Sequence, residues 1–89
     1  MKVQKWNPVT KKYLPYNPPA DWKLRTYCYD MKEVVNCAQC GTELMYGRGY
    51  TSLQIHTEYG MGYCVCGACY EKEMHEEMEA MRHDAKRNH

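Results

Sequence analysis

The chain has 89 residues, which leaves room for one small hydrophobic core and not for two, so we predict a single domain. Its formal net charge is +1, from 12 Lys and Arg against 11 Asp and Glu, which is unlike the strongly basic charge of a typical nucleic-acid-binding domain. There is no Phe, and nine Tyr, seven Met and six Cys supply much of the apolar content. Because Tyr carries a hydroxyl and Met is flexible, such a core would be marginal without an additional stabilising element.

No secretory or membrane-spanning segment is evident. The first six residues, Met-Lys-Val-Gln-Lys-Trp, contain no apolar run of the kind found in a signal peptide. No stretch approaches the roughly 20 apolar residues of a transmembrane helix. We therefore expect a cytoplasmic protein that binds no membrane and whose cysteines are reduced and available to a metal. Three disulfides, which six cysteines could also form, are the alternative.

Residues 1–34 are predicted to form an extended arm that packs on a domain comprising residues 35–89. Four prolines interrupt any helix in the arm and favour polyproline or turn geometry. Asp21 is expected to cap a single helical turn over residues 22–25. The arm carries six aromatic residues, namely Trp6, Tyr13, Tyr16, Trp22, Tyr27 and Tyr29. Since disordered tails are normally poor in aromatic residues, these side chains are expected to cover their own domain or to face a partner.

Short strands are predicted after the arm. Residues 31–36 lead into them as a strand or turn, and residues 42–46 and 50–56 are expected to form a β-hairpin around a turn at residues 47–49. Residues 61–65 follow as a further strand. Alternation within the longest strand places three residues on one face, namely Thr51, Leu53 and Ile55.

One amphipathic helix is predicted from residue 69 to about residue 86. Its apolar residues recur at spacings of three and four, which places them on one face. They are Tyr70, Met74, Met78, Met81 and Ala85. The acidic residues of the helix are expected to form a solvated face, and they include Glu73, Glu76, Glu77 and Glu79.

Two Cys-x-x-Cys pairs, separated by 25 residues, are the most specific motif in the chain. The first pair is Cys37 and Cys40, followed by Gly41, and the second pair is Cys66 and Cys69 at the start of the predicted helix. This spacing brings four thiolates to the corners of a tetrahedron around zinc. The positive end of the helix dipole would also favour the thiolate form of the second pair. The motif therefore predicts one Zn²⁺ held by four cysteines.

The order of cysteine pair, hairpin, strand, cysteine pair and helix resembles the treble-clef zinc finger over about residues 35–86. The resemblance implies that Cys37 and Cys40 lie on a zinc knuckle and that Cys66 and Cys69 lie at the helix start. It also implies a small α+β domain stabilised by a structural metal. The treble clef hosts many unrelated functions, so the resemblance concerns the fold and not the activity.

Cys28 and Cys64 are left over and are expected to be small buried hydrophobic residues. Cys64 is an alternative to Cys66 as a ligand, although Cys66 has the required spacing to Cys69. A second metal site formed by Cys28 and Cys64 with His56 is a further alternative.

We expect no catalysis, because four cysteines leave zinc without an open position for water and no nucleophile motif is present. We also expect no small-molecule substrate. The first functional hypothesis is a protein-interaction module, in which Met78 and Met81 meet the arm or a second copy of the chain. The second hypothesis is a nucleic-acid-binding surface on the basic and aromatic arm, with residues Trp6, Tyr13, Tyr16 and Trp22, and with Arg48 at a hairpin tip.

Overall fold

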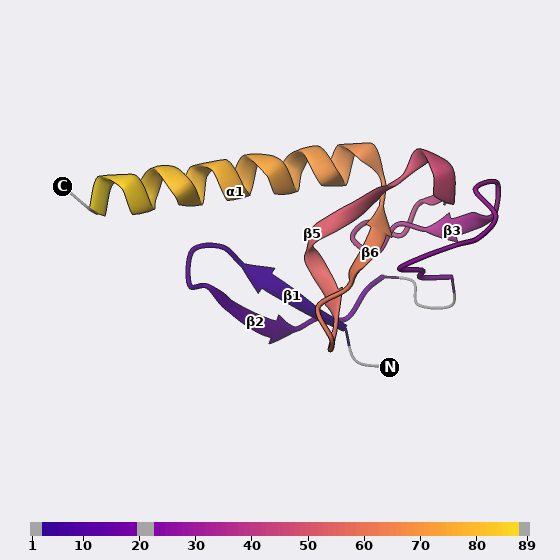
Figure 1. The fold of residues 1–89 in the computed structure, drawn as a ribbon, viewed down its shortest axis with the longest axis horizontal. Helices are drawn as coiled ribbons and strands as arrows, with labels where there is room; N and C mark the ends of the chain where they lie inside the picture. The colour runs from indigo at the N-terminus through magenta and orange to yellow at the C-terminus, as the bar shows by residue number, and fades with distance from the viewer. Residues whose placement is uncertain (1–2, 20–22, 88–89) are drawn as a thin grey trace.

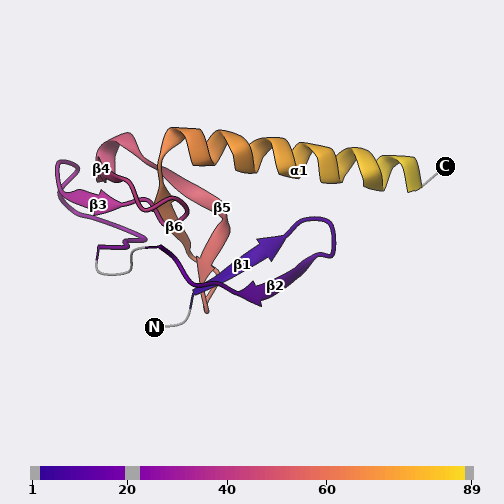
Figure 2. The ribbon, with the colours of Figure 1, turned by 180° about the vertical axis from the view of Figure 1, so that it is seen from behind.

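Six strands and one long helix form an α+β fold in the computed structural model, which describes residues 3–19 and 23–87, with side chains as far as Arg82. In chain order the elements are β1 (Val3–Asn7), β2 (Lys12–Pro15), β3 (Val34–Asn36), β4 (Glu43–Met45), a 3-10 turn at Tyr46–Arg48, β5 (Tyr50–Thr57), β6 (Gly62–Val65) and α1 (Gly67–Arg87). Figures 1 and 2 show α1 as one continuous helix that starts beside β6, runs alongside the β1–β2 hairpin and ends beyond its tip. The strands at residues 34–36, 43–45, 50–57 and 62–65 and the helix confirm the corresponding sequence predictions.

The first 15 residues contain a β-hairpin that the sequence analysis did not predict. β1 pairs with β2 and, on its other side, with β5, so the main sheet has the order β2-β1-β5-β6. The Asn7 side chain accepts hydrogen bonds from the backbone N–H groups of Val9 (2.9 Å) and Thr10 (3.2 Å) and so organises the turn. Part of the predicted extended arm therefore belongs to the main sheet. Because β1 pairs with β5, this sheet includes residues from both sides of the predicted domain boundary at residue 34. The predicted helical turn at residues 22–25 begins outside the described residues, and residues 23–25 contain no helix.

The predicted pairing of the middle strands is wrong. β4 pairs with β3 in a separate two-stranded sheet, whereas β5 pairs with β6. Backbone hydrogen bonds from Tyr46 to Glu33 (2.9 Å) and from Gly47 to Met31 (2.8 Å) hold the chain after β4 against the segment before β3. Arg48 consequently lies on a 3-10 turn between two sheets and not at the tip of a hairpin.

The predicted faces of β5 are also wrong. Ser52 and Gln54 are buried together with Ile55, whereas Leu53 is partly exposed. The register with β6 is irregular between Thr51 and His56, which is typical of a β-bulge. Inside this irregular stretch the Ser52 hydroxyl oxygen accepts hydrogen bonds from the backbone N–H groups of Gln54 (3.1 Å) and Ile55 (2.8 Å). The bulge breaks the alternation on which the prediction depended.

Three methionines of helix α1, Met74, Met78 and Met81, form what we call the methionine face. The helix packs on β5 with a different face. Glu73 is fully buried and Ala80 is 6% exposed, whereas the exposed fractions of Met74, Met78 and Met81 are 41%, 48% and 62%. The expectation that Glu73 is solvated is therefore wrong. Of the two predicted neighbours of Met78 and Met81, the described part of the N-terminal arm does not cover them, and a second copy of the chain stays a prediction. Within the described ranges, no helix combines the length and the hydrophobicity of a transmembrane span.

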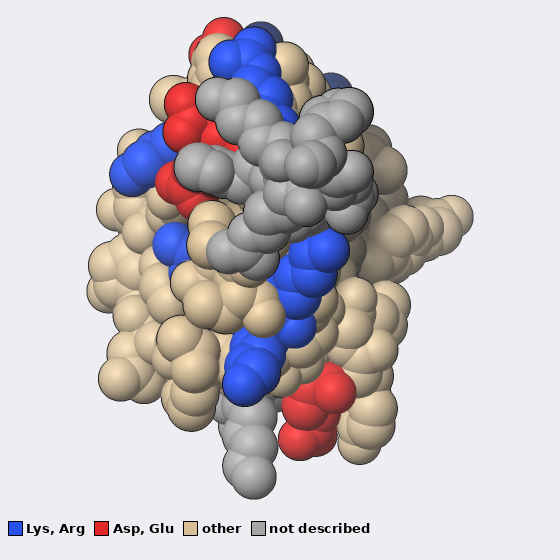
Figure 3. All heavy atoms as spheres, turned by 90° about the vertical axis from the view of Figure 1, so that its left-hand side faces the viewer, with Lys and Arg blue, Asp and Glu red and all other residues tan. Residues whose placement is uncertain are grey.

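The core lies where β5, β6 and the two cysteine pairs meet. Its buried residues are Leu24, Cys37, Ala38, Ile55, Tyr63 and Val65. A smaller cluster consists of Cys28, Val35 and Cys64. At the other end of the molecule, where the hairpin tip and the end of α1 lie, residues of both charge signs reach the surface (Figure 3). The cysteine cluster thus lies at the edge of the main core, with Cys37 buried in it and Cys40 exposed, and the distal half of α1 extends beyond the core.

Candidate metal centre

Four cysteine sulfurs converge at the start of α1. The Sγ atoms of Cys37, Cys40, Cys66 and Cys69 all lie within 4.8 Å of one another. The Cys40 and Cys66 sulfurs are 3.8 Å apart. A tetrahedral zinc with Zn–S bonds of about 2.3 Å separates its sulfurs by about 3.8 Å, so this spacing suits a metal held by four thiolates. The structure therefore brings together the four residues that the sequence motif selected, and they could hold one metal ion.

The first pair lies in the turn between β3 and β4. The backbone N–H groups of Gln39 and Cys40 each lie 3.4 Å from Cys37 Sγ and donate to it. Gly41 has a φ of 81°, which only glycine adopts without strain, and its N–H donates to the Cys37 carbonyl at 2.9 Å. The turn is closed by a hydrogen bond from the Cys37 N–H to the Thr42 carbonyl at 2.8 Å. Gly41 thus allows the tight turn that directs the first two sulfurs toward the same point.

The second pair is positioned by the end of β6 and the first turn of α1. Cys66 follows β6 directly, and Cys69 lies two residues after the first helical residue, Gly67. The Cys66 carbonyl accepts the Tyr70 N–H at 2.9 Å, which is the first hydrogen bond of the helix. The Ala38 N–H also donates to the Cys64 carbonyl at 3.1 Å and ties the first cysteine turn to β6. The Ala38–Cys64 hydrogen bond thus links the backbone segments that carry the two pairs.

The surroundings of the four sulfurs lower the pKa of one cysteine and raise the pKa of others. Without a cation they therefore favour one thiolate and oppose the formation of more. Burial acts to raise the pKa of Cys37, but backbone N–H groups of Cys40 and Cys66 directed at its sulfur lower that pKa to about 7. Burial raises the pKa of Cys69, and hydrogen bonds with the neighbouring thiols raise it further. Burial also raises the pKa of Cys40. Four thiolates this close together would repel one another. A divalent cation would offset that repulsion and stabilise all four thiolates, so the four cysteines fit a bound metal.

The two remaining cysteines are buried outside the cluster. Cys28 and Cys64 are 4% and 3% exposed, as expected for small hydrophobic residues. Burial raises the pKa of Cys64 to about 11, which keeps it a neutral thiol. Cys66, and not Cys64, lies among the four converging sulfurs. All six cysteines are free thiols, so the structure contains none of the three disulfides of the alternative interpretation.

His56 is held by other contacts. Its Nε2 lies 3.2 Å from the Ser52 carbonyl oxygen, which can only accept, so Nε2 carries the proton. Its Nδ1 lies 2.8 Å from the Tyr13 hydroxyl, which then donates to it. These two bonds account for both ring nitrogens, and His56 does not belong to the group of possible metal ligands.

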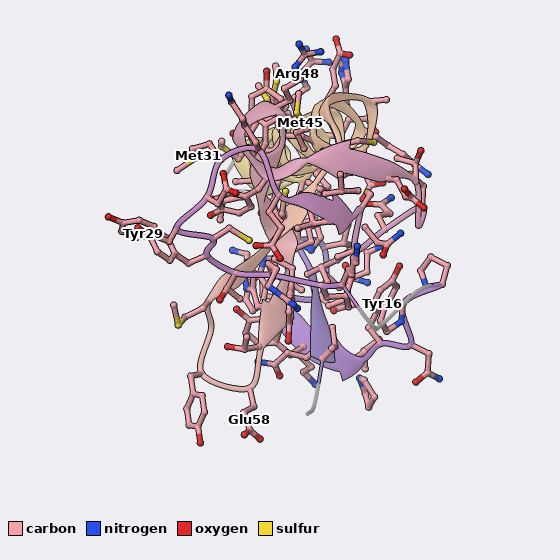
Figure 4. All side chains as sticks on the ribbon, turned by 90° about the vertical axis from the view of Figure 1, so that its right-hand side faces the viewer. Tyr16, Tyr29, Met31, Met45, Arg48 and Glu58 are labelled. Atoms are coloured by element: carbon pink, nitrogen blue, oxygen red, sulfur yellow. The ribbon has the colours of Figure 1, made fainter. Side chains whose placement is uncertain are left out.

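The other predicted binding residues do not form one surface. Trp6 and Tyr13 pack edge to face with ring centroids 5.0 Å apart. The Tyr16 hydroxyl donates to the Gln39 carbonyl at 3.3 Å, so Tyr16 braces the first cysteine turn. Figure 4 shows Arg48 at the top of the molecule and Tyr16 lower down at its side, so the two residues lie on separate parts of the surface. Trp22 lies outside the described residues, as does the side chain of Ala85.

Sequence reasoning missed the buried carboxylate that joins α1 to the sheet. Glu73 accepts hydrogen bonds from the Ser52 hydroxyl (2.7 Å) and the Leu53 N–H (2.7 Å). It therefore satisfies two donors in the irregular stretch of β5. Nothing in the local sequence distinguishes Glu73 from its exposed acidic neighbours, because its partners lie about 20 residues earlier in the chain.

Comparisons with known proteins found no match: no family model, no curated protein and no solved structure matches the chain. The functional interpretation therefore depends on the geometry of the site and of the surfaces around it.

Proposed function

We propose that the chain is a structural-zinc protein that acts as a protein-interaction module through the exposed methionine face of α1, defined as Met74, Met78 and Met81. The observation that carries the proposal is that this face is uncovered in a folded domain, at 41%, 48% and 62% exposure. Met is flexible and polarisable, so such a face adapts to an irregular partner surface. The partner is another protein or a second copy of the chain.

Zinc is the metal we propose, bound in a treble-clef-type arrangement. Four thiolate ligands suit zinc, and in that arrangement the metal has no open coordination position for a substrate or a water nucleophile. We therefore assign the metal a structural role and assign the protein no enzymatic activity. Such a site requires reduced thiols, which agrees with a cytoplasmic location.

The interaction proposal is tested by photo-crosslinking in the native cell. A photoreactive amino acid at position 78 should give discrete adducts with a protein partner or with a second copy. The matched probe replaces Tyr59, which is 85% exposed on the turn between β5 and β6 and lies outside the methionine face. The double variant Met74→Lys/Met81→Lys should lose the adducts while keeping the far-UV circular dichroism of the parent. Identical adducts from positions 59 and 78 would exclude the methionine face as the binding surface.

Nucleic acid is the second candidate, and the composition of the hairpin favours it. Lys5, Lys11 and Lys12 lie on or beside β1 and β2, close in sequence to Trp6 and Tyr13. Cations next to aromatic rings are the usual means of holding single strands. Acidic residues flank the cations at this end of the molecule, so the basic surface is narrow (Figure 3). A mixed-sequence single-stranded oligonucleotide should bind with an affinity that falls steeply with salt, and absence of binding at low salt removes this candidate.

A further inference from the structure

A groove of about 440 Å³ lies between the β1–β2 hairpin and the distal half of α1. The hairpin lies below the helix in Figure 1. Residues from both elements line the groove. Its volume falls in the range of sites that bind small ligands or side chains of a partner. The methionine face lies on a different side of α1, so the two surfaces can be occupied independently.

The hairpin wall of the groove is mostly apolar. Its apolar residues are Trp6, Pro8, Val9, Leu14 and Pro15, and Lys5, Asn7 and Tyr16 line the same side. Val9 and Leu14 are 60% and 57% exposed, so nothing in the described chain covers them. An occupant with apolar groups at its ends would bury these two side chains.

The helix wall of the groove is acidic. Glu76 and Glu79 line it next to Ala80, against one lysine, Lys5. The Lys5 Nζ lies 5.6 Å from the centroid of the Tyr16 ring, in a cation–π contact. Glu79 forms no ion pair with any side chain that the structure describes. The described lining thus has an excess of one negative charge and favours a cation.

A second polar residue, Gln54, lies at the floor of the groove. It is 1% exposed and lines the groove. Its Nε2 donates to Glu76 Oε2 at 3.2 Å, which fixes the orientation of the amide and holds one of the two groove carboxylates in place. Among the described residues its Oε1, which is itself buried, has no hydrogen-bond partner.

We propose that this groove binds an arginine side chain, flanked by apolar residues, in an extended segment of a protein partner. A guanidinium has several N–H donors in one plane, so it can make a bidentate contact with the Glu79 carboxylate. It is also weakly hydrated and stacks on aromatic rings such as Trp6, which an ammonium does less well. The apolar neighbours of the arginine contact Val9 and Leu14.

The test is a titration of the 89-residue, zinc-loaded chain, in which binding is followed by changes in amide NMR chemical shifts. The probe is acetyl-Leu-Arg-Leu-amide, and the matched peptides carry citrulline or Glu in place of Arg. We expect the arginine peptide to shift Trp6, Leu14 and Glu79. The citrulline peptide, which keeps the shape and loses the charge, should bind about tenfold more weakly. The Glu peptide should not bind.

Protein variants separate the groove from the rest of the helix. Glu79→Gln should weaken binding of the arginine peptide by about fivefold to tenfold, whereas Glu71→Gln, at an exposed position of α1 away from the groove, should leave it unchanged. Equal affinity for the arginine and citrulline peptides would overturn the proposal. If free arginine binds as tightly as the peptide, the claim that apolar neighbours of the arginine contribute to binding is wrong. Shifts at Met74 and Met78 in place of the groove would overturn its location.

Discussion

The two ends of the molecule are built on different chemistry. At the end that contains the cysteines, Cys37, Ala38 and Val65 are completely buried, and four sulfurs converge within 4.8 Å. At the other end, Val9 and Met81 are each about 60% exposed, and the hairpin and helix enclose a groove and not a core. Under the proposed function, the end with the cysteines stabilises the fold through its metal, and the hairpin end presents apolar surface to a partner.

Removal of the metal should have the largest effect. A structural zinc contributes on the order of 10 kcal/mol, which is comparable to the roughly 5–15 kcal/mol stability of a whole domain. Because β5 belongs to both ends of the molecule, chelation in reducing buffer should unfold the hairpin end as well. Loss of far-UV circular dichroism on chelation, reversed by added zinc, is the expected result. If the chelated chain still unfolds cooperatively at the same temperature, the fold of the cysteine-containing end does not require metal.

Glu73→Ala should have the next largest effect, because Glu73 connects α1 to β5. The substitution leaves the Ser52 hydroxyl and the Leu53 N–H without their acceptor. We expect a loss of about 1–3 kcal/mol for each unpaired group, measured by urea denaturation. Glu71→Ala, at an exposed helical position, is the control and should change stability by less than about 0.5 kcal/mol. Equal stabilities of the two variants would contradict the role assigned to the buried carboxylate.

Gly49→Ala tests the packing at the metal end. A Cβ at position 49 would clash with Cys64 Sγ and would lie 3.1 Å from the Val65 carbonyl oxygen. We expect a loss of about 1–3 kcal/mol in the free energy of unfolding. Gly67→Ala is the matched control, since its new Cβ meets nothing closer than 3.4 Å. If both variants unfold at the same denaturant concentration, the packing around Cys64 is looser than described.

Tyr13→Phe should have the smallest effect and tests the hairpin end. It removes the hydroxyl that donates to His56 Nδ1 at 2.8 Å. Because Tyr13 is 39% exposed, we expect a loss of only about 0.5–1 kcal/mol. NMR should also show a changed His56 ring environment, which Tyr59→Phe at an 85% exposed position should not produce. An unchanged His56 spectrum in Tyr13→Phe would exclude this contact in solution.

Short-range patterns in the sequence, namely motif spacing and hydrophobic periodicity, predicted the cysteine cluster, two of the strands and the helix. The two Cys-x-x-Cys pairs selected four sulfurs that converge, and the strands at residues 50–57 and 62–65 and the helix lie close to where periodicity placed them. The treble-clef resemblance and the identity of the metal stay predictions.

Contacts between distant parts of the chain were not predictable in the same way. Pro8 and Pro15 suggested a strand-free arm, yet Pro8 lies in the turn and Pro15 ends the edge strand β2, where a missing N–H is tolerated. The pairing of Gln4 with His56 joins residues 52 positions apart, beyond the reach of any local signal. The hydrophobicity of the helix predicts that its methionine face is buried, whereas the face with Glu73 is buried instead. The reason is that the Ser52 hydroxyl and the Leu53 N–H on β5 donate hydrogen bonds to the Glu73 carboxylate.

X-ray absorption at the zinc edge of the purified protein tests the central claim most directly. We predict one zinc per chain with four sulfur neighbours at about 2.3 Å and no nitrogen or oxygen neighbour. The same spectrum should be obtained from Cys64→Ala, whereas Cys66→Ala should lose one sulfur. A spectrum with three or fewer sulfurs in the parent protein would contradict a closed four-cysteine site.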